Sequence, residues 1–520
     1  MHTSFLILAA HGGRVIHDFI ARWATLAPDR VALADLDHGR TLTYRALDDR
    51  VTRLAVALTD GLGLAAGERV AMLTSGRSEV FETYFACARA GLVFVPLNTR
   101  LAAPRMRAVL ADATPALLLH DDAYAELAAT LRATDPLRGV ALGQLRVSGG
   151  DLAYEALIAA ANARPTRPIG LEDVSLVLYT SGTTGFSKGV QIPWRQVLFN
   201  AFNTALACDL SWKDTALGML PLFHTGGLHC VATPVLHQGG RVVLTDGFDA
   251  DRSVSLLREG GITTTIAVPT MYQRLLDAGV TAAPLPAVRA LLCGGAPCPL
   301  PLIDSYHAAG LPLRQGYGLT EVGPNCFTLA PLTGPHRLGS VGWPAFHGAA
   351  RLVDDAGHDV PPETPGELLL RGPHVTPGYF RNREATARAL DADGWFHTGD
   401  VLRRSEDGAF YVVDRKQEMF ISGGENVYPA AVELALGQHP EVAMVAVIPA
   451  DDPRWGQVGV AALVLRAGCA PPSDEALETW AKAHLARYEV PKRWHLVPAL
   501  PLNASGKVDK AALRIALGLG

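Results

Sequence analysis

Short apolar runs rich in β-branched residues alternate with longer segments of helical periodicity through the middle of the chain. Glycine or proline marks most of the joints, as at Pro193 and at the turn at 239–240. A strand, a polar loop and a helix in repeated order are typical of a parallel sheet covered by helices on both faces. The predicted strands of this part lie at 175–179, 215–222, 241–244, 262–269 and 288–292.

The pattern changes near residues 400–425, where a stretch dense in charge and glycine precedes a shorter α+β pattern. Residues 441–448 and 458–465 predict strands, and residues 473–488 predict one amphipathic helix. We place a domain boundary at Asp414, which divides residues 1–413 from residues 414–520. The expected fold is α/β, with a large N-terminal domain of stacked, mainly parallel sheets with helices and a smaller α+β C-terminal domain.

Composition adds few constraints. The chain has 520 residues, 49% hydrophobic and 19% charged, with a net charge of -5, so a general attraction to nucleic acid is not expected. No stretch approaches the roughly 20 apolar residues of a membrane span. The seven cysteines are scattered without a CxxC pair, which indicates reduced thiols in a cytoplasmic protein.

Residues 179–190 read YTSGTTGFSKGV, a loop with three glycines, several hydroxyl residues and one lysine. The triphosphatase pattern GxxxxGK[ST] does not match, because Lys188 follows Ser187 and precedes Gly189. The composition still suits an anion, since glycines let backbone N–H groups turn toward it and Lys188 adds a compact positive charge. Taken alone, the stretch is equally consistent with a flexible surface turn.

Five further stretches, in a defined order, change this picture. Together with the loop they resemble the motifs of the adenylate-forming superfamily, which includes acyl-CoA synthetases, firefly luciferases and nonribosomal adenylation domains. The fatty- or aryl-acid–CoA ligase branch is the most similar. The resemblance implies that the chain joins a carboxylic acid to AMP, releases pyrophosphate and passes the acyl group to an acceptor. The stretches are PLFHTGGL (221–228), GYGLTE (316–321), WFHTGD (395–400), DRKQEMFISGGENVYP (414–429) and PLNASGKVDK (501–510).

The resemblance implies sites for ATP and Mg²⁺. Tyr317 would stack on adenine, Thr320 would bond a phosphate oxygen, and Glu321 would hold Mg²⁺, a hard cation that needs oxygen ligands. Asp400 would accept hydrogen bonds from the ribose diol, with Arg415 as a second contact. Outside this context, each stretch would be an ordinary turn. The implied nucleotide-binding residues are Thr180, Ser181, Gly182, Thr183, Thr184, Gly185, Lys188, Gly295, Ala296, Pro297, Gly316, Tyr317, Gly318, Asp400, Val412 and Arg415.

Lys507 lies in a C-terminal GK pair that would ordinarily be a solvated surface charge. The resemblance makes it a catalytic residue, together with Thr320, Glu321 and His224, and places it between the acyl carboxylate and the α-phosphate. Because an acceptor must enter along the same face, relatives rotate their mobile C-terminal domain about an aspartate, here Asp414. A hinge of this kind concentrates its φ/ψ change in a few residues.

After that rotation, the loop at 422–426 would replace Lys507, and Gly423 and Gly424 would permit close approach of a thiol arm. Trp455 would line the tunnel for the pantetheine of coenzyme A. One departure concerns Glu489, which stands where relatives often have a lysine that meets CoA phosphates. Coenzyme A is thus the expected acceptor, and amide-forming relatives, which use an amine or amino acid, supply the alternative.

The acid is expected to be hydrophobic. Amino-acid-activating relatives carry an aspartate near PLFHTGGL, whereas this chain has His224 and no such carboxylate there. His224 resembles the gate beside the acyl carboxylate; otherwise it would be a helix-end or core histidine. The pocket stretches at 226–230, 294–296 and 323–327, together with Gly316, are small or apolar, which favours an aliphatic or aromatic acid.

One reading from another class is a non-catalytic homologue that only binds nucleotide. The presence of Lys188, Glu321, Asp400 and Lys507 argues against it. We expect small-molecule partners, no nucleic acid and no membrane span, in a monomer or homodimer.

Overall fold

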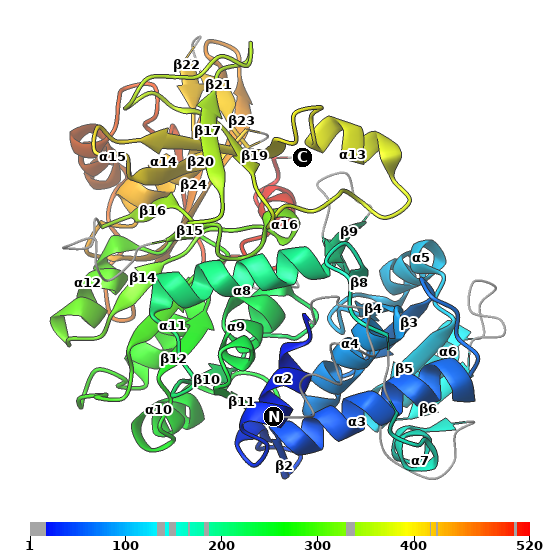
Figure 1. Cartoon of the computed structure of the whole chain (residues 1–520). Helices are drawn as coiled ribbons and strands as arrows, with labels where there is room; N and C mark the ends of the chain where they lie inside the picture. The colour runs from blue at the N-terminus through cyan, green and yellow to red at the C-terminus, as the bar shows by residue number, and fades with distance from the viewer. Residues whose placement is uncertain are drawn as a thin grey trace.

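The computed structural model describes residues 17–132, 141–144, 152–164, 167–180, 187–328, 338–416, 418–422, 425–503 and 507–519. Four β-sheets organise these residues, with helices around and between them (Figure 1). The helices are α2 (Phe19–Leu26), α3 (Tyr44–Val56), α4 (Ser78–Ala90), α5 (Ala103–Ala113), α6 (Ala125–Arg132), α7 (Tyr154–Ala160), α8 (Trp194–Cys208), α9 (Ala232–His237), α10 (Ala250–Glu259), α11 (Pro269–Asp277), α12 (Leu300–Ala308), α13 (Arg383–Ala389), α14 (Pro429–Leu436), α15 (Asp474–His484) and α16 (Lys510–Ala516).

The first sheet has seven strands in the order β14-β13-β12-β10-β11-β1-β2, all parallel except the edge strand β2. Four of the predicted strands lie side by side in it, which confirms the parallel sheet. The strand predicted at 241–244 has the predicted bounds. Two others are clearly shorter: the strand expected at 262–269 spans Thr264–Ala267, and the strand expected at 215–222 ends at Gly218, where the chain turns into the PLFHTGGL segment. The strands are β14 (Leu313–Gln315), β13 (Ala290–Cys293), β12 (Thr264–Ala267), β10 (Thr215–Gly218), β11 (Arg241–Leu244), β1 (Val31–Asp35) and β2 (Arg40–Thr43).

The second sheet also has seven strands, in the order β7-β6-β5-β3-β4-β8-β9, parallel up to the edge strand β9, which is antiparallel to β8. The loop YTSGTTGFSKGV thus connects the two strands of an edge hairpin. The strands are β7 (Leu152–Ala153), β6 (Ala141–Gln144), β5 (Leu117–His120), β3 (Arg69–Leu73), β4 (Val93–Pro96), β8 (Val174–Thr180) and β9 (Lys188–Pro193).

A third sheet, wholly antiparallel, follows in the order β15-β16-β20-β19-β18-β17. It lies outside the predicted parallel pattern, although the expected α/β class is confirmed. Asp414 falls in its strand β20, immediately before the chain leaves this sheet. The strands are β15 (Phe327–Thr328), β16 (Ser340–Pro344), β20 (Phe410–Arg415), β19 (Phe396–Arg404), β18 (Gly366–Arg371) and β17 (Ala349–Val353).

The C-terminal residues form a five-stranded sheet with α14, α15 and α16. The long hairpin of β23 and β24 contains both strands predicted there. The predicted helix at 473–488 ends earlier, at His484, because residues 486–489 form a turn in which the Glu489 carboxylate accepts the Ala486 N–H (2.9 Å). The strands are β21 (Phe420–Ser422), β22 (Glu425–Val427), β23 (Val442–Asp452), β24 (Gly456–Leu465) and β25 (Arg493–Leu496).

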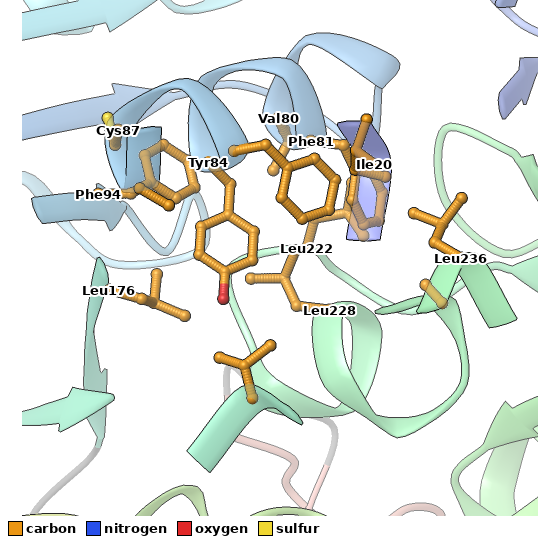
Figure 2. Close-up of a cluster of buried hydrophobic side chains, with 14 of the residues drawn as sticks. Ile20, Val80, Phe81, Tyr84, Cys87, Phe94, Leu176, Leu222, Leu228 and Leu236 are labelled. Carbon is orange, nitrogen blue, oxygen red and sulfur yellow. The ribbon is translucent and has the colours of Figure 1, made fainter. Parts of the chain in front are cut away.

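One hydrophobic core joins the first two sheets, since it contains Leu33 of β1 and Leu176 of β8. Figure 2 shows part of this core, where Tyr84 of α4 lies beside Leu222 and Leu228. These two leucines flank the centre of the PLFHTGGL segment, so the core holds that segment between the sheets. Within the part of the chain that the structure describes, no helix has both the length and the hydropathy of a membrane span.

Candidate active site

The glycine-rich loop at 179–190, called the phosphate-type loop below, has its two ends next to each other at the edge of the second sheet. Thr180 pairs with Lys188 across the β8–β9 ladder, and the Thr180 hydroxyl donates to the Lys188 carbonyl (3.4 Å). The antiparallel register therefore places Lys188 at the base of the loop. The predicted loop residues Ser181, Gly182, Thr183, Thr184 and Gly185 lie outside the described residues.

Lys188 is connected to Glu321 through Tyr379. The Lys188 Nζ lies 5.2 Å from the centre of the Tyr379 ring, and the Tyr379 hydroxyl donates to Glu321 Oε1 (2.9 Å). Burial raises the pKa of the Glu321 carboxyl, an effect opposed by the Tyr379 hydrogen bond and by the charges of Arg415 and Lys188. Sequence reasoning missed Tyr379, because a tyrosine in a PGYF stretch carries no chemical signature of its own.

The loop that carries Thr320 and Glu321 is held by one side-chain hydrogen bond, from Gln196, and one backbone hydrogen bond, from Thr376. Thr320 and Glu321 form a short 3₁₀ turn, Thr320–Val322, rather than the start of an α-helix. Gln196 Nε2 of α8 donates to the Thr320 carbonyl (2.9 Å), and the Thr376 N–H donates to the Glu321 carbonyl (2.7 Å). Gly318 has no room for a side chain, since a Cβ there would lie 2.3 Å from the Pro324 carbonyl.

Asp400 is the centre of a second cluster. The register of β19 with β20 pairs Asp400 with Arg415, and Arg415 Nε lies 3.2 Å from Asp400 Oδ1. The Tyr317 hydroxyl donates to Asp400 Oδ2 (2.6 Å), which fixes the orientation of the ring predicted to stack on adenine. Burial raises the pKa of Asp400, opposed by Arg415, Tyr317 and Lys507. Val412, also on β20, pairs with Leu402.

Glycines without side chains follow the carboxyl ends of two strands: Gly294 and Gly295 follow β13, and Gly316 follows β14. Side chains on Gly294 or Gly316 would find their nearest neighbours at 3.6 and 3.7 Å, so packing does not require glycine at either position. Gly295 has a φ of +83°, and a Cβ there would lie 3.8 Å from Lys507 Cε. The exposed Ala296 and Pro297 follow. Gly294, Gly295 and Gly316 therefore expose backbone without side chains, with Gly295 next to Lys507, and we call these three residues the glycine floor.

Lys507 joins the site from the C-terminal part of the chain. Its backbone is fixed by Asn503, whose side chain accepts the Lys507 N–H (3.1 Å) and whose N–H donates to the Lys507 carbonyl (2.7 Å). The side chain stays accessible to solvent but has protein on most sides. This surrounding protein and the charge of Arg415 lower its pKa, while Asp400 and Glu418 oppose the shift.

The charges of Lys507 and Arg100 both act on His224. Its Nε2 is buried and has no hydrogen-bond partner among the described residues. Burial, with the charges of Arg100 and Lys507, lowers its pKa to about 4. His224 is thus a neutral imidazole at physiological pH. Arg100, in the loop after β4, was missed by sequence reasoning, because only the fold brings the second sheet beside PLFHTGGL. His229, in contrast, is a core histidine whose Nε2 lies 3.2 Å from the Tyr84 hydroxyl.

The segment after Asp414 is anchored at several points. Asp414 is 4% exposed; its Oδ1 accepts the Arg415 N–H (2.6 Å) and its Oδ2 accepts the Ala430 N–H at the start of α14 (2.7 Å). Lys510 Nζ bridges Glu418 (2.8 Å) and Glu433 (3.0 Å). Asp414 therefore links the end of the third sheet to the first helix of the C-terminal sheet.

Trp455 lies in a different part of the C-terminal sheet. It occupies the turn between β23 and β24, is 41% exposed, and donates its N–H to Asp452 Oδ1 (2.9 Å). Ser422 pairs with Gly456 beside it. In Figure 1, β21 and β22 lie at the top of the view, whereas α16, which begins three residues after Lys507, lies near the centre. Gly423 and Gly424 lie outside the described residues.

The predicted residues thus form one electrostatic cluster. Lys188 and Arg415 act on Glu321, and Arg415 and Lys507 act on Asp400. Three cations around two carboxylates suit a polyanion that carries a diol and a divalent cation. A nucleoside triphosphate with Mg²⁺ has these groups, and the residues present fit it. The glycine floor adds room for a flat or apolar group beside Lys507.

Comparison with known proteins agrees with this arrangement. Residues 20–380 match the family model described as AMP-binding enzyme, and residues 431–507 match the AMP-binding enzyme C-terminal domain. The chain is 41% identical over 500 residues to a feruloyl-CoA synthase of Amycolatopsis sp., covering 96% of this chain and 98% of the relative. It is 38% identical over 503 residues to the indoleacetate–CoA ligase of Aromatoleum aromaticum, covering 96% and 97%.

Among solved structures, the chain is similar to the o-succinylbenzoate CoA synthetase of Bacillus subtilis. The complex with its acyl-adenylate intermediate has a TM-score of 0.84 at 32% identity and covers 95% of this chain and 97% of that one. A complex of the same enzyme with ATP and magnesium has a TM-score of 0.82 at 32% identity, covering 94% and 98%. The chain therefore belongs to the AMP-binding enzyme family, in the acyl-CoA synthetase branch of the adenylate-forming superfamily, and is an AMP-forming acid–CoA ligase.

Proposed function

We propose that this ligase activates a hydrophobic aromatic acid, with the ring at the end of a short chain, and transfers the acyl group to coenzyme A. The glycine floor beside Lys507 carries this proposal. Gly294 and Gly316 could accommodate a Cβ, so the space beside them is available to a flat ring rather than needed for packing. Relatives named for feruloyl-CoA and indoleacetate support an aromatic acid of this shape. An aliphatic acid is the alternative.

In the first step, the acid carboxylate would attack the α-phosphate of ATP beside Lys507, and the bond to pyrophosphate would break. Asp400, with Arg415, would hold the ribose, and Lys188 would meet the terminal phosphates. Neutral His224 would lie beside the carboxylate and could donate a hydrogen bond without adding charge. Mg²⁺, held by Glu321 and phosphate oxygens, would neutralise charge on the departing pyrophosphate.

In the second step, the thiol of CoA would attack the acyl carbon and AMP would leave. We propose that residues 414–520 rotate as a lid about Asp414, so that the loop at 422–426 and Trp455 replace Lys507. Glu489, the residue that favoured an amine acceptor, caps its own turn through the Ala486 N–H. This local role accounts for an acid at that position, and relatives named as CoA synthases or ligases support CoA as the acceptor. Use of ATP and CoA, with seven free cysteines, supports a cytoplasmic location.

The test incubates the enzyme with ATP, Mg²⁺, CoA and a panel of aromatic, aliphatic and dicarboxylic acids, and identifies the products by mass. We expect thioesters only when CoA is present, with hydroxycinnamic and indole acids preferred over straight-chain acids of equal carbon number. An amide formed from an added amine without CoA would contradict the acceptor. A straight-chain preference would contradict the aromatic pocket.

A further inference from the structure

Tyr379 lies between the two groups that are proposed to hold the opposite sides of Mg·ATP. Its ring faces Lys188, with the Nζ at 5.2 Å, and its hydroxyl donates to Glu321 Oε1 at 2.9 Å. The side chain is only 9% exposed, so both contacts are made in a largely dry environment. Lys188 and Glu321, both within the described residues, form no ion pair with each other.

The backbone around Tyr379 is fixed to both partners. Tyr379 bridges to Val190 in antiparallel fashion, and the Phe380 N–H donates to the Gly189 carbonyl (2.7 Å), so this segment adds to the edge strand β9 beside Lys188. Three residues earlier, the Thr376 N–H donates to the Glu321 carbonyl (2.7 Å). The segment 376–380 therefore connects the hairpin of the phosphate-type loop to the loop of Glu321.

We propose that Tyr379 is a positioning residue that keeps Lys188 and Glu321 apart and ready, one for the terminal phosphates and the other for the metal ion. This inference rests on the proposed function. The hydroxyl donates to Oε1, and the proposal assigns the divalent cation to Oε2 of Glu321. The ring holds the ammonium by a cation–π contact that a phosphate can displace.

The physical need for such a spacer follows from charge. A lysine and a glutamate near one another in a partly dry site attract strongly, and a direct ion pair would have to be broken before either could bind its ligand. The Tyr379 side chain instead gives each charge a weaker partner. Burial beside Glu321 raises the pKa of the Tyr379 hydroxyl, so the phenol stays a donor across the physiological range.

Two variants separate the hydroxyl from the ring. Tyr379→Phe keeps the ring, and we expect Mn²⁺ affinity of the enzyme–ATP complex, measured by electron paramagnetic resonance, to fall about tenfold, since a hydrogen bond to a charged group is lost. ATP affinity in EDTA, measured by calorimetry, should stay within twofold. Tyr379→Leu removes the ring as well, and ATP affinity in EDTA should then fall a further few-fold, because Lys188 can pair with Glu321.

Tyr44→Phe is the matched control. Tyr44, at the start of α3, is a buried tyrosine whose hydroxyl donates to the Gly240 carbonyl (2.8 Å) and not to Glu321, and its variant should leave Mn²⁺ and ATP binding unchanged. Equal Mn²⁺ affinity in Tyr379→Phe and the wild-type enzyme would overturn the role of the hydroxyl. Equal ATP affinity of Tyr379→Leu and Tyr379→Phe in EDTA would overturn the role of the ring. Failure of the wild-type enzyme to bind ATP would instead overturn the proposed function.

Discussion

Lys507 reaches the nucleotide residues from the far end of the chain, and its surroundings determine what it can do there. It lies beside the glycine floor, with Asp400 and Arg415 among the charges that act on it. Surrounding protein and Arg415 lower its pKa, and Asp400 and Glu418 supply only part of the counter-charge for this solvent-exposed ammonium group. An incoming carboxylate and phosphate would supply that counter-charge, so its interaction is strongest where negative charge moves.

Lys507→Ala should therefore reduce adenylate formation about 10²–10³-fold, the usual effect of removing one preorganised donor. Thioester formation from supplied acyl-adenylate should be unchanged, because the proposed rotation removes Lys507 from the site before that step. Pyrophosphate exchange measures the first step, and CoA thioester release from synthetic acyl-adenylate measures the second. Equal losses in both would contradict this assignment.

Substitution by alanine should destabilise the chain at Gly318 but not at Gly316. In Gly318→Ala the new Cβ would meet the Pro324 carbonyl at 2.3 Å, so the loop of Thr320 and Glu321 must shift. We expect a loss of roughly 1–3 kcal/mol in the free energy of unfolding, with weaker ATP binding.

Gly316→Ala has its nearest neighbour at 3.7 Å and should keep the stability of the wild-type chain. It narrows the glycine floor, so its KM for the acid should rise while ATP binding is retained. Urea unfolding and binding calorimetry distinguish the two variants. A destabilised Gly316→Ala variant would mean that the floor is filled by the protein itself.

The site residues divide by whether their chemistry can be read locally. Lys188, Glu321, Asp400 and Lys507 lie in distinctive motifs, and the structure brings them into one cluster. Tyr379 has no such motif, because its importance comes from the register of its segment against β9 and from one hydroxyl contact. Arg100 likewise acquires its neighbours only through the packing of one sheet against another.

At the scale of elements, Asp414 contacts the first turn of α14 and is also the residue at which the hinge is proposed. The hinge was predicted from resemblance, whereas the contact of its carboxylate with the first turn of α14 depends on tertiary structure. Burial raises the pKa of Asp414, opposed by the Ala430 N–H. The carboxylate thus anchors the helix to the residue about which the proposed rotation occurs.

Asp414→Pro should permit adenylation and block thioester formation, because proline fixes φ near -65° and prevents the backbone change. Asp414→Ala is the control: it loses the contact with α14, at about 1 kcal/mol, but keeps its φ free, so both steps should proceed. Single-turnover assays of each step provide the measurement. Normal overall turnover in Asp414→Pro would rule out this hinge.

Five strands of the two mainly parallel sheets were predictable because each is a short apolar run near glycine or proline, as at 241–244 and 288–292. The other strands of these sheets were not predicted. The ends of the five strands were less predictable: β10 stops at Gly218 although the apolar run continues to Leu222, which instead packs into the core between the sheets. The antiparallel third sheet was not predicted, since its strand β19 contains the polar FHTGD motif and lacks a clear alternation.

For the whole molecule, buried histidines link stability to pH. His229 is 3% exposed, and burial lowers its pKa to about 3. Its ordinary pKa is about 6.5, so between that value and about 3 the unfolded chain binds a proton that the folded chain does not. This contribution is therefore complete above pH 6.5 and is lost as the pH falls.

His229→Gln should remove that dependence. From pH 6.5 to 4.5, the free energy of unfolding of the wild-type enzyme should fall by about 2–3 kcal/mol more than that of the variant. Urea unfolding at several pH values measures the difference between the two slopes, which is independent of any constant cost of the substitution. Parallel curves would show that folding does not change the pKa of His229.

Trp455 lies in the turn between β23 and β24, whereas Lys507 lies just before α16. Under the proposed rotation, only one of these two residues can face the acid at a time. That exclusion imposes ping-pong kinetics, with pyrophosphate released before the thiol enters. In a cell short of CoA, the enzyme would then retain its bound acyl-adenylate rather than hydrolyse ATP without forming a thioester. Substrate order would thus be set by which surface the small domain presents, and not by relative affinities.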